Sequence, residues 1–480
     1  MKKIQNYING ELVAPQSGQY IDNFNPAEGK VYSLTPDSGS QDIQRAVNAA
    51  KTAFPSWSST PVEMRSNLLL RIAVLIDKNL NQLALAESID NGKPLSLASS
   101  VDIPRASSNI RFFATAILHF NTDAHKMDNV AINYTTREPI GIAGCISPWN
   151  LPLYLFTWKI APALAAGNCV IAKPSEITPM TAYLFSELCI EAGLPKGVLN
   201  IVHGLGTKAG QAIIEHQDIP IISFTGGTAT GKHIAATAAP MFKKLSLELG
   251  GKNPNLIFAD CDFDQALNTS VMSSFSNQGQ ICLCGSRILV ERSIYDKFVT
   301  AFVDKVNKMT IGDPLEDTTK TGAVVSESHM KKVLSYIKLA KEEGGQVVAG
   351  GQQVHLKGRC ENGYFIEPTV ITGLGHNCRT NQEEIFGPVV TIMPFDTQEE
   401  AVKYANSTAY GLSATLWTEN ITRAHNIAHQ LKSGIVWVNC WLVRDLRTPF
   451  GGMKQSGVGR EGGNEALRFF TEAKNVCIKL

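Results

Sequence analysis

The sequence predicts an α/β protein with parallel, doubly wound sheets, because strand and helix signals alternate along two long stretches. In the first stretch, short apolar runs predict strands at 141–147, 168–173, 199–202 and 221–225. Patterns with helical spacing lie between them, at 158–166, 178–192 and 208–215. Repeated strand–helix units with short connections favour a parallel sheet covered by helices on both faces. A second run of this kind extends from about residue 255 to 439.

Three helices are expected before the first of these strands. The segment 40–57 places Ile43, Ala46, Val47, Ala50 and Phe54 on one face. Pro61 opens the next helix, since proline suits a first helical turn. A third runs over 81–90 and ends at the stop signal Asn91-Gly92-Lys93-Pro94. The first forty residues, which contain Asn9-Gly10 and Asn25-Pro26, are expected to form hairpins and turns.

Two further segments alternate like strands but belong to neither α/β run. They are Val130–Thr136 and the tail Lys474–Leu480. An exposed strand edge invites pairing with another chain unless something covers it. We therefore expect another chain to cover both segments, with each strand extending a sheet of a partner.

Composition excludes several function classes. A chain of 480 residues predicts two or three domains, and a net charge of +1 offers no field for nucleic acid or an anionic membrane. The N-terminus lacks the apolar region of a secretory signal, and no run of about 18 apolar residues predicts a membrane span. We expect a cytoplasmic protein whose ten cysteines are mostly buried and reduced.

Two motifs carry chemistry. Phe275-Ser276-Asn277-Gln278-Gly279-Gln280-Ile281-Cys282 presents a cysteine in a polar, glycine-punctuated segment before the strand-like Ile288-Leu289-Val290. Leu247-Glu248-Leu249-Gly250-Gly251-Lys252 places a carboxylate between two leucines. A thiolate nucleophile and a carboxylate base on separate loops indicate acyl chemistry. Cys282-Leu283-Cys284 lacks the further ligands that a zinc site needs, so we expect no metal. Cys284 is interpreted as a packing residue, with a resolving thiol as the alternative.

Both motifs resemble the signatures of the NAD(P)-dependent aldehyde dehydrogenase superfamily, and the resemblance extends from about Asn25 to Lys479. It implies that Cys282 attacks the aldehyde, that a thiohemiacetal transfers hydride to the nicotinamide, and that Glu248 activates water to hydrolyse the thioester. Asn150, in Ser147-Pro148-Trp149-Asn150, is implied as the oxyanion donor. Leucines on both sides of Glu248 are expected to raise its pKa by desolvation.

The resemblance also implies an NAD site. The implied residues are Trp149, Lys173, Glu176, Thr225, Gly226, Gly227, Gly231, Glu384 and Phe386. A carboxylate at Glu176 accepts from a ribose 2′-hydroxyl and repels a 2′-phosphate, which favours NAD over NADP. The family usually has Ser where Gly227 stands, so one phosphate hydrogen bond is expected to be missing.

Three arginines point to an acidic substrate: Arg105, Arg444 and Arg447. With Ile281-Cys282-Leu283-Cys284, this pattern is similar to the 2-aminomuconate and 2-hydroxymuconate semialdehyde dehydrogenases, whose aldehydes carry a carboxylate. Arg105 and Arg444 would hold that carboxylate bidentately, with Arg447 as a less certain third. The alternative is that these arginines form interdomain ion pairs.

Other functions stay open at this point. A broad-specificity or betaine-type aldehyde dehydrogenase is the main alternative, although several arginines would repel the cationic betaine aldehyde. A CoA-acylating enzyme is disfavoured because it uses thiolysis and does not need Glu248 to activate water. A binding protein that has lost activity is disfavoured because it could lose Cys282, Glu248 or Asn150 freely, and all three are present.

The resemblance implies three domains and a homodimer or homotetramer. An NAD-binding domain is expected over 1–118 and 140–250, a catalytic domain over 251–449, and a small β oligomerisation arm over 119–139 and 464–480.

Overall fold

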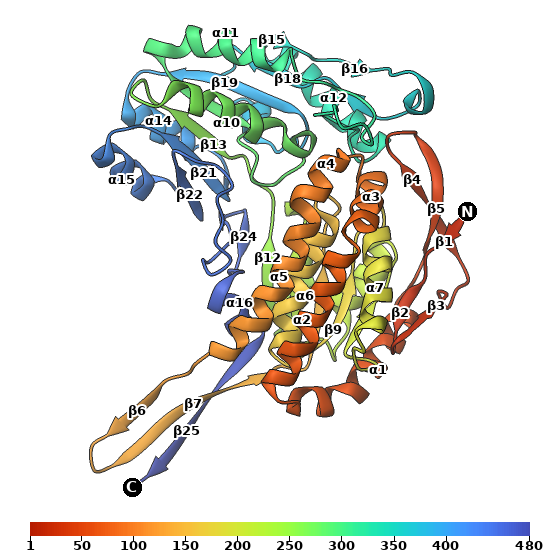
Figure 1. Ribbon diagram of the computed structural model, residues 1–480. Helices are drawn as coiled ribbons and strands as arrows, with labels where there is room; N and C mark the ends of the chain where they lie inside the picture. The colour runs from red at the N-terminus through yellow and green to blue at the C-terminus, as the bar shows by residue number, and fades with distance from the viewer.

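The computed structural model describes all 480 residues and places them in two large sheets, each with helices, and a projecting arm (Figure 1). The centre of the first sheet has five parallel strands: β8 (Ile142–Ile146), β9 (Cys169–Lys173), β10 (Leu199–Ile201), β11 (Ile221–Thr225) and β12 (Lys244–Glu248). Their order is β12-β11-β8-β9-β10, so the chain starts in the middle and winds to both sides. The doubly wound α/β prediction is confirmed.

Antiparallel strands complete the edges of this sheet. They are β24 (Gly457–Val458) beside β12, and then β2 (Asn6–Ile8) and β3 (Glu11–Val13) beyond β10. A separate sheet holds β1 (Lys2–Lys3), β4 (Tyr20–Asn25) and β5 (Lys30–Pro36). The hairpins expected in the first forty residues are therefore present, and β2 and β3 join the main sheet.

Helices cover the first sheet and bury one core cluster of 67 residues. They are α1 (Ser40–Ser59), α2 (Val62–Lys78), α3 (Leu80–Asn91), α4 (Leu95–Leu97), α5 (Ile103–Ala116), α6 (Pro152–Ala165), α7 (Met180–Glu191), α8 (Gln211–Glu215) and α9 (Thr228–Ala238). Two differences from the sequence prediction stand out. Helix α6 starts six residues earlier than predicted, and α5 was not predicted. Every residue of α6 is buried, so its sequence lacks the polar stripe that marks an amphipathic helix.

The second sheet is also built mainly from parallel strands. Its order is β15-β18-β19-β14-β13-β21-β22, and every neighbouring pair is parallel except the edge strand β15 with β18. The strands are β13 (Pro254–Ile257), β14 (Arg287–Glu291), β15 (Gln346–Ala349), β18 (Thr369–Thr372), β19 (Val389–Phe395), β21 (Ser413–Trp417) and β22 (Ile435–Val438). The helices around it are α10 (Phe263–Phe275), α11 (Tyr295–Val306), α12 (Glu327–Glu342), α13 (Arg379–Gln382), α14 (Gln398–Ala405) and α15 (Ile421–Gln430).

Two small antiparallel sheets of two strands each complete this part of the chain: β16 (Gln353–Val354) with β17 (Phe365–Ile366), and β20 (Tyr410–Gly411) with β23 (Met453–Lys454).

The two alternating segments that the sequence left without a domain pair with each other. Strand β7 (Ala131–Pro139) lies between β6 (Ala124–Met127) and β25 (Thr471–Lys479), and both pairings are antiparallel. Figure 1 shows this three-stranded arm extending from the body at the lower left, after α16 (Gly463–Phe469). The outer edges of β6 and β25 stay unpaired in the chain.

No helix is both long enough and apolar enough to cross a bilayer.

Candidate active site

Cys282 lines two cavities that meet near the boundary between the sheets. The first cavity is about 250 Å³ and includes Trp149, Asn150, Thr225, Gly226, Gly227, His329, Lys332, Glu384 and Phe386. The second cavity is about 190 Å³, mainly apolar, and includes Leu151, Tyr154, Leu155, Glu248, Met272, Trp441, Arg444 and Phe450. Thr225, Leu249 and Cys282 belong to both. A group bound in either cavity can therefore reach the sulfur from its own side.

The turn before Cys282 has an unusual backbone. Asn277, Gln278 and Gly279 all have positive φ, at 51°, 56° and 68°. Left-handed conformations of non-glycine residues are unfavourable, so they persist only where their surroundings fix them. The Gln278 side-chain amide donates to the Ala323 carbonyl at 2.6 Å, and Gln280 Oε1 accepts from the Val325 amide at 3.0 Å. These bonds hold the loop that presents Cys282.

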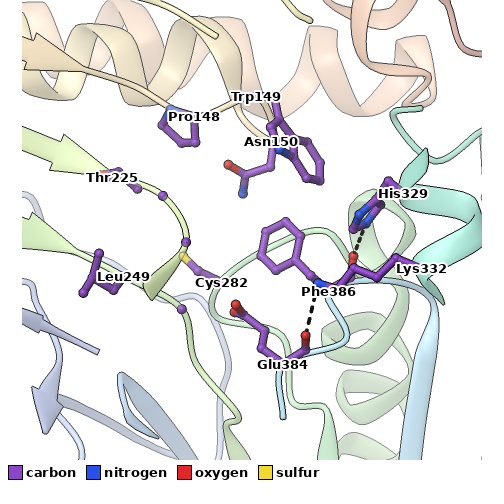
Figure 2. A pocket seen from close by; sticks show the side chains of 13 residues that line it. Pro148, Trp149, Asn150, Thr225, Leu249, Cys282, His329, Lys332, Glu384 and Phe386 are labelled. Carbon is purple, nitrogen blue, oxygen red and sulfur yellow. Dashed lines mark hydrogen bonds between the residues drawn. The ribbon is translucent and has the colours of Figure 1, made fainter. Parts of the chain in front are cut away.

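Asn150 is fixed to this same turn. Its carbonyl accepts from Asn277 Nδ2 at 2.9 Å and from Lys93 Nζ at 3.1 Å, while its own Nδ2 donates to the Gln280 carbonyl at 2.9 Å. A side-chain amide has two N–H groups, so one remains for another acceptor. Figure 2 shows the Asn150 amide and the Cys282 sulfur at the edge of one cavity.

A buried charge cluster supports the Asn150 loop. Lys93 is fully buried; it hydrogen-bonds Asp102 and lies 3.6 Å from Glu87. Glu87 Oε2 accepts from the Leu153 backbone amide at 3.3 Å. Because these partners contact both ends of the loop, they restrain the backbone around Asn150.

Burial raises the pKa of both the nucleophile and the base that the sequence predicts. It raises the pKa of Cys282, and the nearby Glu384 and Glu248 raise it further, while Arg444 opposes them. Burial, followed by the neighbouring Glu461 carboxylate, also raises the pKa of Glu248 well above its usual range. Lys159 opposes this rise, and its Nζ lies 2.8 Å from Glu461 Oε1. Neither carboxyl oxygen of Glu248 has a hydrogen-bond partner. Glu248 thus has the elevated pKa that the sequence predicts, and its proton-accepting oxygens are free.

The residues implied for NAD lie around two hollows. Lys173 Nζ bonds Glu176 Oε2 at 3.0 Å, and Glu176 lines a third cavity of about 580 Å³ with Phe224 and Thr230. Thr225, Gly226 and Gly227 line the first cavity. The loop between β11 and α9 therefore borders both hollows.

Helix α9 offers unsatisfied donors at this loop. It begins at Thr228 with Gly227 as its N-cap, and no side chain caps its amides. Thr225 Oγ1 is buried without a partner. Free amides at a helix N-terminus suit an anion such as a diphosphate. These residues fit a dinucleotide. Gly231, the other glycine implied here, is buried against Leu249, where an added Cβ would lie 2.5 Å from Leu249 Cδ2.

Glu384 and Phe386 approach the first cavity from the second sheet. Glu384 Oε1 accepts from the Gly251 amide at 2.8 Å, and a Cβ on Gly250 would lie 2.2 Å from Glu384 Oε2. Only glycine fits at residue 250 with this carboxylate in place. The Phe386 ring meets Trp149 edge-on, with centroids 5.3 Å apart.

The structure separates the three arginines. Arg444 lines the second cavity; its guanidinium lies 4.0 Å from the Phe450 ring centroid and donates to the Tyr154 hydroxyl at 2.9 Å. Arg105 lies 5.8 Å from the centroid of the same Tyr154 ring. Arg447 instead pairs with Asp445, two residues away, and is largely exposed. Arg444 and Arg105 thus converge on Tyr154, but only Arg444 lines the second cavity; Arg105 and Arg447 are not among its lining residues.

Three lining residues were not singled out from the sequence: Tyr154, His329 and Lys332. Tyr154 falls within the apolar run that forms α6, where it resembles a core residue. His329 and Lys332 lie on α12, far along the chain from every motif. Only the tertiary packing brings them to the cavity.

Known proteins match the chain over nearly all of its length. The family model described as "Aldehyde dehydrogenase family" matches residues 12–476. The 2-aminomuconic semialdehyde dehydrogenase of Danio rerio is 51% identical, covering 99% of this chain and 98% of the relative. The 2-hydroxymuconic semialdehyde dehydrogenase of Pseudomonas sp. (strain CF600) is 47% identical and covers 100% of both. Among solved structures, the NAD+ complex of an aldehyde dehydrogenase from Bacillus cereus superposes with a TM-score of 0.97. It is 40% identical and covers 100% of this chain and 97% of that one.

Proposed function

Because this chain belongs to the aldehyde dehydrogenase family, we propose that it oxidises a semialdehyde bearing a carboxylate, of the 2-aminomuconate or 2-hydroxymuconate 6-semialdehyde type, to the acid. Its cofactor is NAD. The observation that carries the substrate proposal is Arg444, a cation without a carboxylate partner in the cavity that also holds Cys282.

The first step is attack by sulfur on the aldehyde carbon. Cys282 must lose its proton to attack, and burial disfavours the thiolate, so a nearby base has to accept that proton. Glu248, which lines the same cavity and has two unpaired oxygens, is proposed to accept it and to pass it to solvent before the hydrolysis step. As the C–S bond forms, the carbonyl π electrons move to oxygen. The free N–H of Asn150 is proposed to stabilise that oxyanion, an interaction typically worth about 2.7–4 kcal/mol in the transition state.

NAD, when bound, supplies the two-electron acceptor that converts the thiohemiacetal into a thioester. The chain's residues then complete the reaction. Glu248 removes a proton from water, the hydroxide adds to the thioester carbon, and the C–S bond breaks to return the Cys282 thiolate. The lining of the second cavity is mainly apolar and includes Glu248. We expect it to keep water other than the molecule bound to Glu248 away from the acyl group.

Arg444 and Arg105 are proposed to hold the substrate carboxylate. Tyr154 keeps the Arg444 fork in place through its hydroxyl, and Phe450 packs against the guanidinium. A guanidinium that stacks on rings and keeps free N–H donors is suited to bidentate carboxylate binding. This arrangement favours binding of a substrate carboxylate by the arginines over the interdomain ion pairs that the sequence left open.

The test is steady-state NADH formation with 2-hydroxymuconate semialdehyde and with hexanal. Arg444→Ala is expected to lower kcat/KM for the muconate aldehyde. The loss of transition-state stabilisation should be about 2–5 kcal/mol, since the substrate carboxylate is left unpaired in a desolvated site. That loss corresponds to roughly 30- to 5,000-fold, because each 1.4 kcal/mol is a factor of ten. Hexanal should be spared. Arg447→Ala, which alters only the exposed pair with Asp445, is the matched control and should change neither substrate.

Equal losses on both aldehydes in Arg444→Ala would leave the arginine a structural role. The mainly apolar lining of the second cavity would then favour the alternative function, a broad-specificity or betaine-type aldehyde dehydrogenase. Comparable wild-type rates on hexanal, betaine aldehyde and the muconate aldehyde would point the same way.

A further inference from the structure

Two side chains of α12 hold the backbone of the loop that carries Glu384 and Phe386. His329 Nε2 lies 2.6 Å from the Phe386 carbonyl oxygen, and Lys332 Nζ donates to the Glu384 carbonyl at 3.3 Å. Residues three apart on a helix share a face, so both side chains reach the same loop. Figure 2 shows both contacts as dashed lines at the side of the cavity opposite Cys282.

The tautomer of His329 follows from its partner. A carbonyl oxygen only accepts, so Nε2 carries the proton and donates. Burial lowers the pKa of His329 to about 4, so the ring is neutral near pH 7 and keeps this single donor. Ser326 Oγ accepts from the His329 backbone amide at 3.2 Å and caps α12, which fixes the start of the helix.

Phe386 needs such support because its backbone is left-handed, with φ of 62°. A bulky residue is strained in this region and keeps such a conformation only when its surroundings determine it. The next residue, Gly387, lies directly against α12, since an added Cβ would be 2.5 Å from Val333 Cγ2. Trp149 packs edge-on against both rings, with centroids 5.1 Å from His329 and 5.3 Å from Phe386.

We propose that His329 is a positioning residue: it holds Phe386 in the left-handed conformation that presents the phenyl ring to the first cavity, and it promotes binding of the nicotinamide half of NAD through that ring. The inference rests on the proposed function only in placing the nicotinamide beside Phe386. It does not depend on which aldehyde is oxidised.

The experiment compares the binding of NADH with that of ADP-ribose, which lacks the nicotinamide, by calorimetry without any aldehyde. His329→Phe keeps an aromatic ring but removes the donor. It should weaken NADH binding by roughly 5- to 30-fold, the usual effect of leaving a buried carbonyl unpaired. ADP-ribose should bind within twofold of wild type. His329→Gln, whose amide can donate to the same carbonyl, should recover most of the NADH affinity.

A double-mutant cycle tests whether His329 acts through Phe386. In a Phe386→Ala background, His329→Phe should weaken NADH binding by less than a further twofold. Lys338→Ala, on the exposed face of α12, is the control and should change neither ligand. Should His329→Phe fail to fold, His329→Ala provides the same comparison.

Two outcomes would overturn the positioning role. Equal weakening of NADH and ADP-ribose would mean that His329 supports only the general structure. Full, additive losses in the double variant would mean that His329 contacts the ligand independently of Phe386. If Phe386→Ala alone leaves NADH binding unchanged, the nicotinamide placement in the proposed function is wrong, and the inference fails with it. Loss of the muconate preference leaves this inference untouched.

Discussion

Glu248 shows how one side chain's surroundings prepare it for its proposed task. Leucines flank it in the sequence, burial raises its pKa, and the nearby Glu461 raises it further. A base works best when its pKa is close to the operating pH, because it is then both deprotonated and basic. Lys159 opposes this rise in the pKa of Glu248.

Glu248→Gln is therefore expected to stop hydrolysis while leaving earlier steps possible. Steady-state NADH production should fall by about 10²–10⁴-fold, the usual contribution of a general base. A stopped-flow trace should still show a burst of NADH that approaches one equivalent per site, but the burst should be slower than in wild type because Glu248 no longer takes the Cys282 proton. Glu465→Gln, which changes an exposed carboxylate paired with Arg468, should behave as wild type. A burst as fast as in wild type would show that Glu248 takes no part in deprotonating Cys282.

The direction in which kcat changes with pH follows from the form of Glu248 that is active. Only ionised Glu248 accepts a proton, so kcat should fall as the pH drops through its raised pKa. In Glu248→Gln the residual rate should lack that acidic limb.

For single residues, local motifs predicted the proposed reacting side chains but not the side chains that hold them in place. Cys282, Glu248 and Asn150 stand in short, recognisable segments. Lys93, Tyr154 and His329 act through contacts with residues 57, 290 and 57 positions away. No local pattern encodes such pairings, so they required the structure.

Among the elements, helix α9 begins without a side-chain cap, at the glycine where the sequence comparison expects a serine. Gly227 is its N-cap, and no side chain satisfies the first amides. An added Cβ at residue 227 meets nothing within 4 Å, and the φ of −70° is accessible to any residue. The site therefore has space for the missing hydroxyl.

Gly227→Ser should strengthen NADH binding, because the new hydroxyl can donate to the diphosphate. One hydrogen bond is worth about 0.5–1.5 kcal/mol, or a roughly 2- to 12-fold lower Kd. Gly39→Ser is the matched control, since Gly39 is the N-cap of α1, has equally open space and lies at a different helix. It should alter unfolding without altering the Kd. An unchanged Kd in Gly227→Ser would place the diphosphate elsewhere.

The sequence identified elements well where turn residues bounded a short apolar run, and poorly where polar residues interrupted the apolar pattern. Strands β8, β9 and β11 lie within a residue or two of the predicted ranges because each is a short apolar run between turns. The predicted helix 208–215 instead begins with a π-helical turn at Gly206–Gly210 and continues as α8. Helix α5 was missed because its Ser, Asn and Arg residues interrupt the apolar stripe that Ile103, Ile110 and Phe113 form only in the folded helix.

The whole molecule has one feature that a single copy leaves incomplete, the β arm. Ile132 and Ile478 are cross-strand partners in it, yet they are 39% and 53% exposed. Apolar pairs on an extended sheet with free edges are typical of surfaces that another chain covers. We therefore expect a homodimer or homotetramer in which the arm contacts a second copy.

Charging this pair should dissociate the assembly. Wild type is expected to sediment as a multiple of the 52.1 kDa chain, and Ile132→Lys with Ile478→Glu should sediment closer to one chain. Ile421→Lys, which charges an exposed isoleucine on α15 in the body, should leave the mass unchanged. A wild-type protein that sediments as a single chain would remove the arm from any role in assembly.

The site draws on both sheets, and this has a practical consequence for following how the chain folds. Asn150 and Glu248 come from segments of the first sheet, whereas Cys282 and Glu384 come from segments of the second. Residues of both halves line the cavities around the Cys282 sulfur, so its access to solvent should change when the two halves meet. The rate at which a small reagent alkylates this thiol therefore reports whether the two halves have docked. During refolding, protection of this thiol should appear after each sheet has formed and at the moment when the two halves join.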